Sequence, residues 1–302
     1  MRSILTLGSL LALLLASLVT PTLAAPDYPG GPDLIVDDDL ACSRATFRTI
    51  QTAVDAATPG TKIRVCPGTY TEDVLIRLPL KLVAKPLGGA VIHGSIRIDG
   101  DLSPSSPFLG GDDVRLEGFV VDATGHDTGV LVYMADRVDV RTTSVSGATY
   151  AGISLVDSGD VTVRDTTSSH NLGHGIALNG MVRTTVKHNS TNNNGGDGIH
   201  QQEGEFNHYD TNTSDHNGAN GISICFDANF DRIENNRANN NSLAGIAICG
   251  ESVRGITIKK NTLQQNTTDA VDETSGGGTA GTNNTWSKNT CVTSTPAGLC
   301  SN

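Results

Sequence analysis

The sequence predicts an all-β fold, a parallel β-helix solenoid, from two observations: a fixed repeat and an alternation of apolar and polar residues within each repeat. A glycine followed by an apolar residue returns through the middle of the chain at Gly129, Gly152, Gly175, Gly198, Gly221 and Gly245. The steps between these glycines are 23, 23, 23, 23 and 24 residues. A fixed period of this size is typical of stacked coils, in which each repeat buries its apolar edge against its neighbours.

Each repeat carries at least two short strands. Residues 152–155 read Gly-Ile-Ser-Leu, and residues 161–164 read Val-Thr-Val-Arg. Period-two alternation of this kind predicts strands, and no helical period competes with it. Propeller blades need about 40 residues per repeat, and the leucines of a leucine-rich repeat are missing. A parallel β-helix, in which each coil rises by about 4.8 Å, fits the spacing.

Asparagines recur just after the second strand of successive repeats, at Asn189, Asn212, Asn236 and Asn261. Asn tolerates left-handed backbone angles, and stacked amides hydrogen-bond along the axis of a solenoid. We therefore interpret Asn189 and Asn212 as ladder residues, although each also begins a glycosylation sequon.

Helical spacing is confined to the N-terminal part, where Phe47, Ile50, Ala53 and Val54 would share one face. Pro59 and Gly60 end that pattern. A short capping helix here would cover the open first coil, whose strand edges and apolar columns are otherwise exposed.

The first 25 residues are typical of a secretory signal. A basic residue, Arg2, is followed by a short apolar run and by small residues at 24–25, which predicts cleavage near Ala24–Pro26. The expected domain covers residues 26–302, with an N-terminal cap over 33–70 and a disulfide-tied C-terminal tail over 280–302. No later segment has the length and apolarity of a membrane span.

The formal net charge of −11 argues against nucleic acid as a partner, because phosphate binding needs a basic surface. We expect a monomer. The six cysteines of an exported chain predict disulfides rather than metal ligands. Cys225 and Cys249 each lie four residues after a repeat glycine, and thus on adjacent coils at the same ladder position. The predicted pairs are Cys42–Cys66, Cys225–Cys249 and Cys291–Cys300.

Three N-terminal segments (residues 35–39, 49–51 and 59–70) resemble the opening of secreted right-handed β-helix proteins of the pectate-lyase-like superfamily. With the Gly-Ile repeats, the resemblance covers about residues 33 to 290. It implies a right-handed helix of eight to ten coils. It leaves the activity open, because the superfamily contains lyases, hydrolases, epimerases, esterases and proteins without known catalysis.

One coil, residues 198–220, is rich in ionisable side chains and breaks the repeat's own rule. Gln201 takes the place of an inward Leu or Ile, and broken local rules concentrate at functional sites. In the second strand, Arg141, Arg164 and Lys187 form an outward column that ends at Asp210. Two interpretations of this column stay open: internal salt bridges to Asp136, Asp139 or Asp165, or an anionic polysaccharide lying over it.

The superfamily resemblance implies roles for these groups. Elimination from a uronate needs a cation at the carboxylate and a base for the proton, and hydrolysis needs paired carboxylates. The catalytic candidates are Arg164, Lys187, His200, Glu203, His208 and Asp210. The substrate-binding candidates are Arg141, Gln202 and Asp227.

Two functions follow as hypotheses. The first is a secreted polysaccharide-active enzyme, lyase- or epimerase-like on acidic glycans; the alternative is a non-catalytic extracellular glycan- or surface-binding β-helix in which His200 and His208 are ordinary exposed side chains. No metal site is predicted: residues 37–39 lack the spacing of a calcium loop, and His170 and His174 are expected in loops. Calcium is the one cofactor that we keep open.

Overall fold

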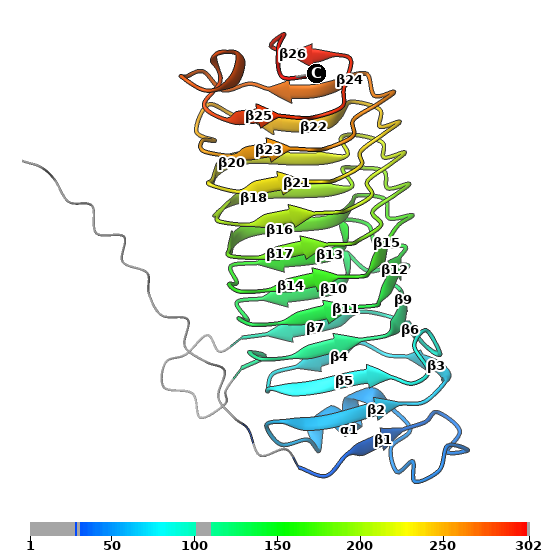
Figure 1. Ribbon diagram of the computed structural model, residues 1–302. Coiled ribbons are helices and arrows are strands. Elements are labelled where there is room, and N and C mark those ends of the chain that lie inside the picture. The colour runs from blue at the N-terminus through cyan, green and yellow to red at the C-terminus, as the bar shows by residue number, and fades with distance from the viewer. Residues whose placement is uncertain (1–27, 29–30, 101–109, 301–302) are drawn as a thin grey trace, which may run out of the picture.

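The computed structural model describes residue 28, residues 31–100 and residues 110–300. The predicted signal segment lies outside these ranges. The described chain winds as a parallel β-helix of about ten coils stacked along one axis (Figure 1). The predicted all-β solenoid is confirmed.

Three parallel sheets form the walls of the helix. Sheet A has eleven strands: β1 (Leu34–Val36), β2 (Thr61–Val65), β5 (Leu80–Ala84), β8 (Arg115–Glu117), β11 (Asp139–Arg141), β14 (Thr162–Arg164), β17 (Thr185–Lys187), β19 (His208–Asp210), β21 (Arg232–Glu234), β23 (Thr257–Lys259) and β25 (Thr285–Ser287). Sheet B has five: β3 (Gly68–Thr71), β6 (Ala90–His93), β9 (Phe119–Asp122), β12 (Ser144–Ser146) and β15 (Thr167–Ser168). Beyond β15 it continues as single-residue bridges.

Sheet C has ten strands: β4 (Val74–Ile76), β7 (Ile96–Asp99), β10 (Thr128–Tyr133), β13 (Ala151–Val156), β16 (His174–Val182), β18 (Ile199–Glu205), β20 (Ile222–Asn229), β22 (Ala244–Cys249), β24 (Thr268–Asp272) and β26 (Ser294–Thr295). A 3-10 turn, η1 (Thr279–Gly281), precedes β25.

The register of sheet C aligns equivalent residues of successive repeats. One outward column reads Leu131, Ser154, Ala177, His200, Ser223 and Ala247. A second reads Tyr133, Val156, Asn179, Gln202, Cys225 and Cys249. Both columns agree with the sequence prediction. The inward residues, such as Ile153 and Ile176, are fully buried and form a continuous core along the axis.

The repeat glycines are required by space rather than by backbone angle. A Cβ atom on Gly175 would lie 2.5 Å from the carbonyl oxygen of Gly198, and one on Gly198 would lie 1.8 Å from Ser214 Oγ. Any side chain there would push neighbouring coils apart, which is why the 23-residue period is marked by glycine.

The predicted asparagine column forms a buried ladder. Asn189 donates from its backbone N and from Nδ2 to Asn212 Oδ1, at 3.0 and 3.1 Å, and Asn212 repeats both bonds to Asn236. The left-handed residue is the one before each ladder asparagine, for example His188 at φ 54°, rather than the asparagine itself. A second ladder, not foreseen from the sequence, runs through Asn171, Asn194, Asn217, Asn241 and Asn266.

A single α-helix, α1 (Ile50–Asp55), lies in the N-terminal part of the described chain and is shorter than the sequence pattern suggested. Its Thr49 N-cap accepts a bond from the Thr52 backbone, and its first amides donate to the carboxylate of Glu72. The helix buries Ile50, Ala53 and Val54 against β1, β2 and β4.

All three predicted disulfides are present: Cys42–Cys66, Cys225–Cys249 and Cys291–Cys300. The second of these joins register partners on β20 and β22, as the ladder argument required. Within the described residues, no helix has the length and apolarity needed to cross a bilayer.

Candidate functional site

The residues of the sequence-predicted site lie on two opposite faces of the solenoid. Inside the coil, Gln201 of β18 accepts a short hydrogen bond from the hydroxyl of Tyr209 of β19, and both side chains are fully buried. Sheets A and C therefore face each other through the core. Because side chains alternate along a strand, His200 and Gln202 point outward on one side, whereas His208 and Asp210 point outward on the other.

This contact also explains the broken repeat rule at Gln201. Tyr209 takes the place of the inward valine or isoleucine of sheet A, and its hydroxyl needs a partner in the core. Gln201 supplies that partner and donates its own amide to the carbonyl of Glu203 at 3.0 Å. The inward polar residue thus satisfies a buried tyrosine.

The basic column on sheet A is largely paired within the protein. Arg141 lies 3.0 Å from a Glu117 carboxylate oxygen and 3.7 Å from Asp139. Arg164 lies 3.4 Å from Asp139 and 3.1 Å from Asp165. For the two arginines of this column, the geometry shows the internal salt bridges.

Lys187 forms no ion pair within the described residues. Its register partner on β19 is Asp210, whose Oδ1 accepts from Asn235 Nδ2 at 2.7 Å. Burial raises the pKa of Asp210, but bonds from Asn235 and Thr211 and the nearby His208 and His188 outweigh it and lower that pKa.

His208 sits beside an acidic residue that already has two cations. Its Nε2 is buried without a hydrogen bond and lies 4.0 Å from Glu234, which also pairs with Arg232 at 2.9 Å and Lys259 at 3.0 Å. The outer face of sheet A is therefore a network of charges that mostly neutralise each other.

On sheet C, four of the predicted residues spread along the ends of two strands. The His200 side chain is 14% exposed. Gln202, on the same strand, is half-buried. Glu203 is exposed at the bulge between Gln202 and Gly204. Asp227, also exposed, donates its backbone N–H to Ser252 Oγ at 2.9 Å.

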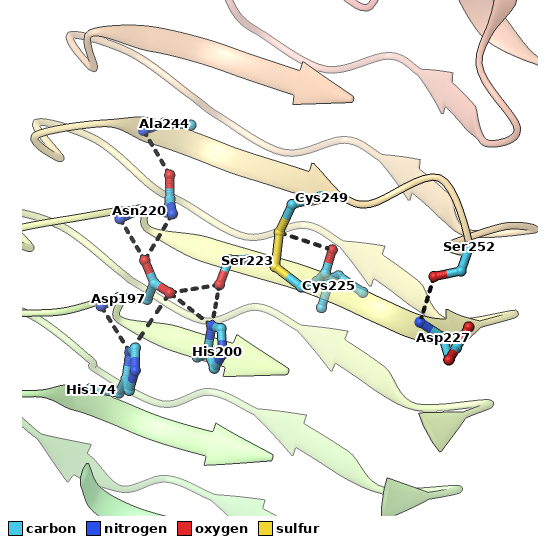
Figure 2. The surroundings of a disulfide bond; sticks show 11 residues. His174, Asp197, His200, Asn220, Ser223, Cys225, Asp227, Ala244, Cys249 and Ser252 are labelled. Atoms are coloured by element: carbon cyan, nitrogen blue, oxygen red, sulfur yellow. Dashed lines mark hydrogen bonds and ion pairs between the residues drawn. A yellow bond between two sulfur atoms is a disulfide. The ribbon is translucent and has the colours of Figure 1, made fainter. Parts of the chain in front are cut away.

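Three residues that sequence reasoning did not select complete a compact cluster around His200 (Figure 2). Asp197 Oδ2 lies 2.9 Å from His200 Nδ1 and accepts from Ser223 Oγ at 2.7 Å. The imidazole of His174, the first residue of β16, stacks on that of His200 with centroids 4.5 Å apart and ring planes 11° apart. Their arrangement depends on three adjacent coils.

Asp197 gives the two imidazoles opposite tautomers. Nδ1 of His200 lies 2.9 Å from Asp197 Oδ2 and 2.7 Å from Ser223 Oγ. Because Ser223 donates its own proton to Asp197, both neighbours of Nδ1 are acceptors, so we place the proton of the neutral ring on Nδ1 and a free lone pair on Nε2. His174 Nδ1 accepts the backbone N–H of Asp197 at 3.1 Å, so its proton is on Nε2. Neither Nε2 has a partner among the described residues, and neither is sealed from solvent.

The charge states follow from the surroundings of each group. Burial, together with the nearby His200, lowers the pKa of His174 against the opposing effect of Asp197 and favours the neutral ring. Burial raises the pKa of Asp197, but bonds from His200, Ser223 and the Asn220 backbone outweigh it and keep the carboxylate ionised.

The donor set His174, Asp197 and His200 is close enough for a metal ion, but its geometry is poor for one. A ring nitrogen directs its lone pair in the plane of the ring, and two nearly parallel rings cannot both point at an ion between them. Both Nδ1 atoms are also engaged by Asp197. The cluster therefore fits proton transfer better than metal binding.

Glycines lie next to the cluster, where adjacent coils approach closely. Gly173, Gly195 and Gly196 follow the coil edge, and a Cβ atom on Gly173 would lie 1.9 Å from the carbonyl oxygen of Tyr150. Tyr150 itself is 48% exposed and meets His174 edge-on. Leu172, which precedes Gly173, is 74% exposed on the same edge.

A separate shallow depression of about 390 Å³ lies at the turns between sheets C and A, lined by Asp136, Asp157, Ser158, Gly159, Gly180, Val182 and Arg183. None of the predicted site residues lines it.

Solved structures of similar shape share the fold at low sequence identity. The mannuronan C-5 epimerase AlgE6 A-module of Azotobacter vinelandii has a TM-score of 0.62 and 18% identity, with 80% of this chain and 71% of that chain covered. Pectate lyase Pel9A has a TM-score of 0.56 and 16% identity, with 87% of this chain and 78% of that chain covered. XylC in complex with xylose has a TM-score of 0.54 and 11% identity, with 82% of this chain and 68% of that chain covered. At these identities the similarity concerns the fold alone.

A search of curated proteins gave no match. The family model described as "Right handed beta helix region" matches residues 128–291, more than half of the chain. The chain therefore belongs to this right-handed β-helix family.

Proposed function

We propose that this protein is a secreted polysaccharide-active enzyme of the lyase or epimerase type, with its proton-transfer site at His200 and His174 on the outer face of sheet C. One observation carries the proposal: a single residue, Asp197, holds two stacked imidazoles in opposite tautomers. One Nε2 is then a proton acceptor and the other a hydrogen-bond donor, side by side on one face.

The two rings suit abstraction of the proton next to a sugar carboxyl group. His200 Nε2 takes the proton, and the electron pair of the broken C–H bond moves onto the carboxyl oxygen. The Nε2–H of His174 donates a hydrogen bond to that oxygen as it gains charge. The pair then either expels the neighbouring glycosidic oxygen, which takes a proton from water, or returns to carbon with a new proton.

Support for a polysaccharide substrate comes from the fold and from the shape of the site. The named structural neighbours include an epimerase of mannuronan and a pectate lyase. The cluster lies on the outer face of an extended sheet, which suits a chain polymer better than an enclosed small molecule.

The proposal divides the sequence-predicted residues by face. His200 is the base, and Gln202, Glu203 and Asp227 border the same face. Arg141, Arg164, Lys187, His208 and Asp210 lie on sheet A, across the core from His200, where we assign them to the charge network of the fold. A non-catalytic glycan-binding module remains the second candidate, favoured by the paired charges of sheet A.

The test is turnover on a panel of uronate polysaccharides, followed both by ultraviolet absorbance of an unsaturated product and by release of reducing ends. We expect His200→Ala to lower the rate about 100-fold or more, and His174→Ala to lower it more than His174→Gln, which keeps a donor. Circular dichroism confirms that the variants are folded. Full activity of His200→Ala would refute the assigned base.

We further propose the domain plan expected from the sequence: a signal over residues 1–25, an N-terminal cap in which α1 covers the first coil, and a tail over 280–302 held by Cys291–Cys300. Three disulfides are consistent with an extracellular location. Deleting residues 1–25 and following secretion tests the first element.

A further inference from the structure

Among the described residues, the outer face of sheet C between β10 and β22 carries no basic residue around the two imidazoles. The outward column of His200 reaches a basic residue at Arg97 of β7, the register partner of Leu131, which is bonded to Asp99. From β10 to β22, the outward columns that contain His200 and Gln202 hold only uncharged or imidazole side chains in the described structure. The glycine edge beside them, at Gly173, Gly195 and Gly196, also lacks lysine and arginine. The basic residues of sheet A point away on the other side of the core.

The charges that do border this face are mainly acidic or already paired. Glu203 and Asp227 are exposed at the strand ends. Arg183, in the turn after β16, is bound through two nitrogens to Asp160 at 2.8 Å. Arg254 follows β22, two coils and therefore about 10 Å along the axis from His200.

Removing a proton next to a free carboxylate places a second negative charge on the same group. Such a step needs a cation at the carboxylate, because two like charges on one group in a partly buried site repel strongly. Among the described residues, the donors that the structure places beside His200 are neutral: the Nε2–H of His174, the Ser223 hydroxyl and the Gln202 amide. A carboxyl group without a charge gains only one negative charge in the same step, which a neutral donor can stabilise.

We infer that the reacting sugar unit carries an uncharged carboxyl derivative, such as an ester, rather than a free carboxylate. The inference rests on the proposed function, since it concerns the substrate of the same site. It narrows the expected acidic glycan to an esterified one.

The test compares two polymers of one backbone: methyl-esterified polygalacturonate and the same material after saponification, both with a calcium chelator present. Turnover is followed by product absorbance, and binding by calorimetry with the His200→Ala variant. We expect the esterified polymer to react about tenfold faster or more and to bind more tightly.

The outcomes separate the two proposals. Equal or faster turnover of the saponified polymer overturns the inference and leaves the proposed function standing. Preferential binding of the ester without turnover of either polymer supports the inference about the face, but removes the proposed catalysis. Equal or tighter binding of the saponified polymer without turnover overturns both.

A charge-insertion pair makes the test independent of the choice of polymer. Asn179→Lys places a cation in the outward column beside Gln202, at a half-buried position whose side chain has no hydrogen bond among the described residues. We expect it to shift the preference toward the free acid several-fold. Thr185→Lys adds the same charge on sheet A, across the core, and should leave the preference unchanged; equal shifts by both variants would overturn the inference.

Discussion

Sheets A and C are built on the same repeat, yet their outer faces treat ionisable groups in opposite ways. On sheet A, Arg141 and Arg164 alternate with Glu117, Asp139 and Asp165, and the charges bind one another. On sheet C, one carboxylate holds two imidazoles and leaves an unbound Nε2 on each. Like charges stacked about 4.8 Å apart along a solenoid repel one another unless each is paired with an opposite charge. A charge that is already paired within the protein binds a substrate group only weakly.

The largest expected contrast is between matched carboxylate-to-amide changes on the two faces. Asp197→Asn keeps the shape of the cluster but replaces the carboxylate that fixes the proton on His200 Nδ1. We expect the proton to move to Nε2 and turnover to fall about 100-fold or more. Nitrogen NMR of the imidazoles reports the tautomer directly.

Asp139→Asn is the control on sheet A and should retain most of the turnover, although it removes a partner of Arg141 and Arg164. A loss of activity in Asp139→Asn comparable with that in Asp197→Asn would contradict the assignment of the site to sheet C.

The next contrast concerns Asp231, a buried acidic residue that has no cationic partner among the described residues. Asp231 is fully buried before β21; its Oδ1 accepts the Asn207 N–H at 2.6 Å, and its Oδ2 has no hydrogen-bond partner among the described residues. Burial raises its pKa to about 7, against the bond from Asn207. An acid whose pKa is higher when folded costs stability as the pH rises from its unfolded value of about 4 to about 7.

Asp231→Asn should therefore stabilise the protein by up to about 4 kcal/mol at pH 8 and have little effect at pH 4. The introduced amide is also expected to donate to the carbonyl of Gly204. Asn207, one coil earlier, makes the equivalent bond from its Nδ2 to the Met181 carbonyl at 3.0 Å, and Gly204 is the register partner of Met181. Denaturant unfolding at the two pH values measures the effect, and a stabilisation that did not depend on pH would contradict the buried charge.

A smaller effect is expected from the covalent link between coils on sheet C. Replacing Cys225 and Cys249 together by serine should lower the free energy of unfolding by about 2 kcal/mol or less, because the strands they join are already aligned by the ladder. Thermal unfolding with and without reductant checks this value. Unchanged melting of the wild-type protein in reductant would argue against a stabilising role for any of the three disulfides.

The smallest expected effect is on the ionic links between coils on sheet A. Glu234→Gln removes the common partner of Arg232 and Lys259 and should cost about 1 kcal/mol. Burial opposes ionisation of Glu234, but its bonds to Lys259 and Arg232 lower its pKa below the usual value. Its contribution is therefore present at neutral pH and is lost as the pH falls through the lowered pKa.

High salt should reduce the loss of unfolding free energy in Glu234→Gln, because the ion pairs of Glu234 with Arg232 and Lys259 are partly solvated. A cost that was unaffected by salt would point to lost packing rather than to lost charge pairing.

The sequence by itself determined the columns of this molecule. Once the glycine spacing is known, the parallel register follows, and with it the neighbours of His200, the Cys225–Cys249 disulfide and the Asn189 ladder. Periodicity identifies which residues share a column because every coil repeats the same geometry.

Only the tertiary structure decided which columns share a face. The sequence predicted one site from His200 and Lys187, but the bond between Gln201 and Tyr209 shows that their strands face each other through the core. Nor did the repeat reveal that Asp197 bridges His174 and His200, since that depends on side-chain rotamers at a coil edge. A repeat pattern fixes inward and outward positions, whereas the direction of each outward face depends on how the coil bends between its strands.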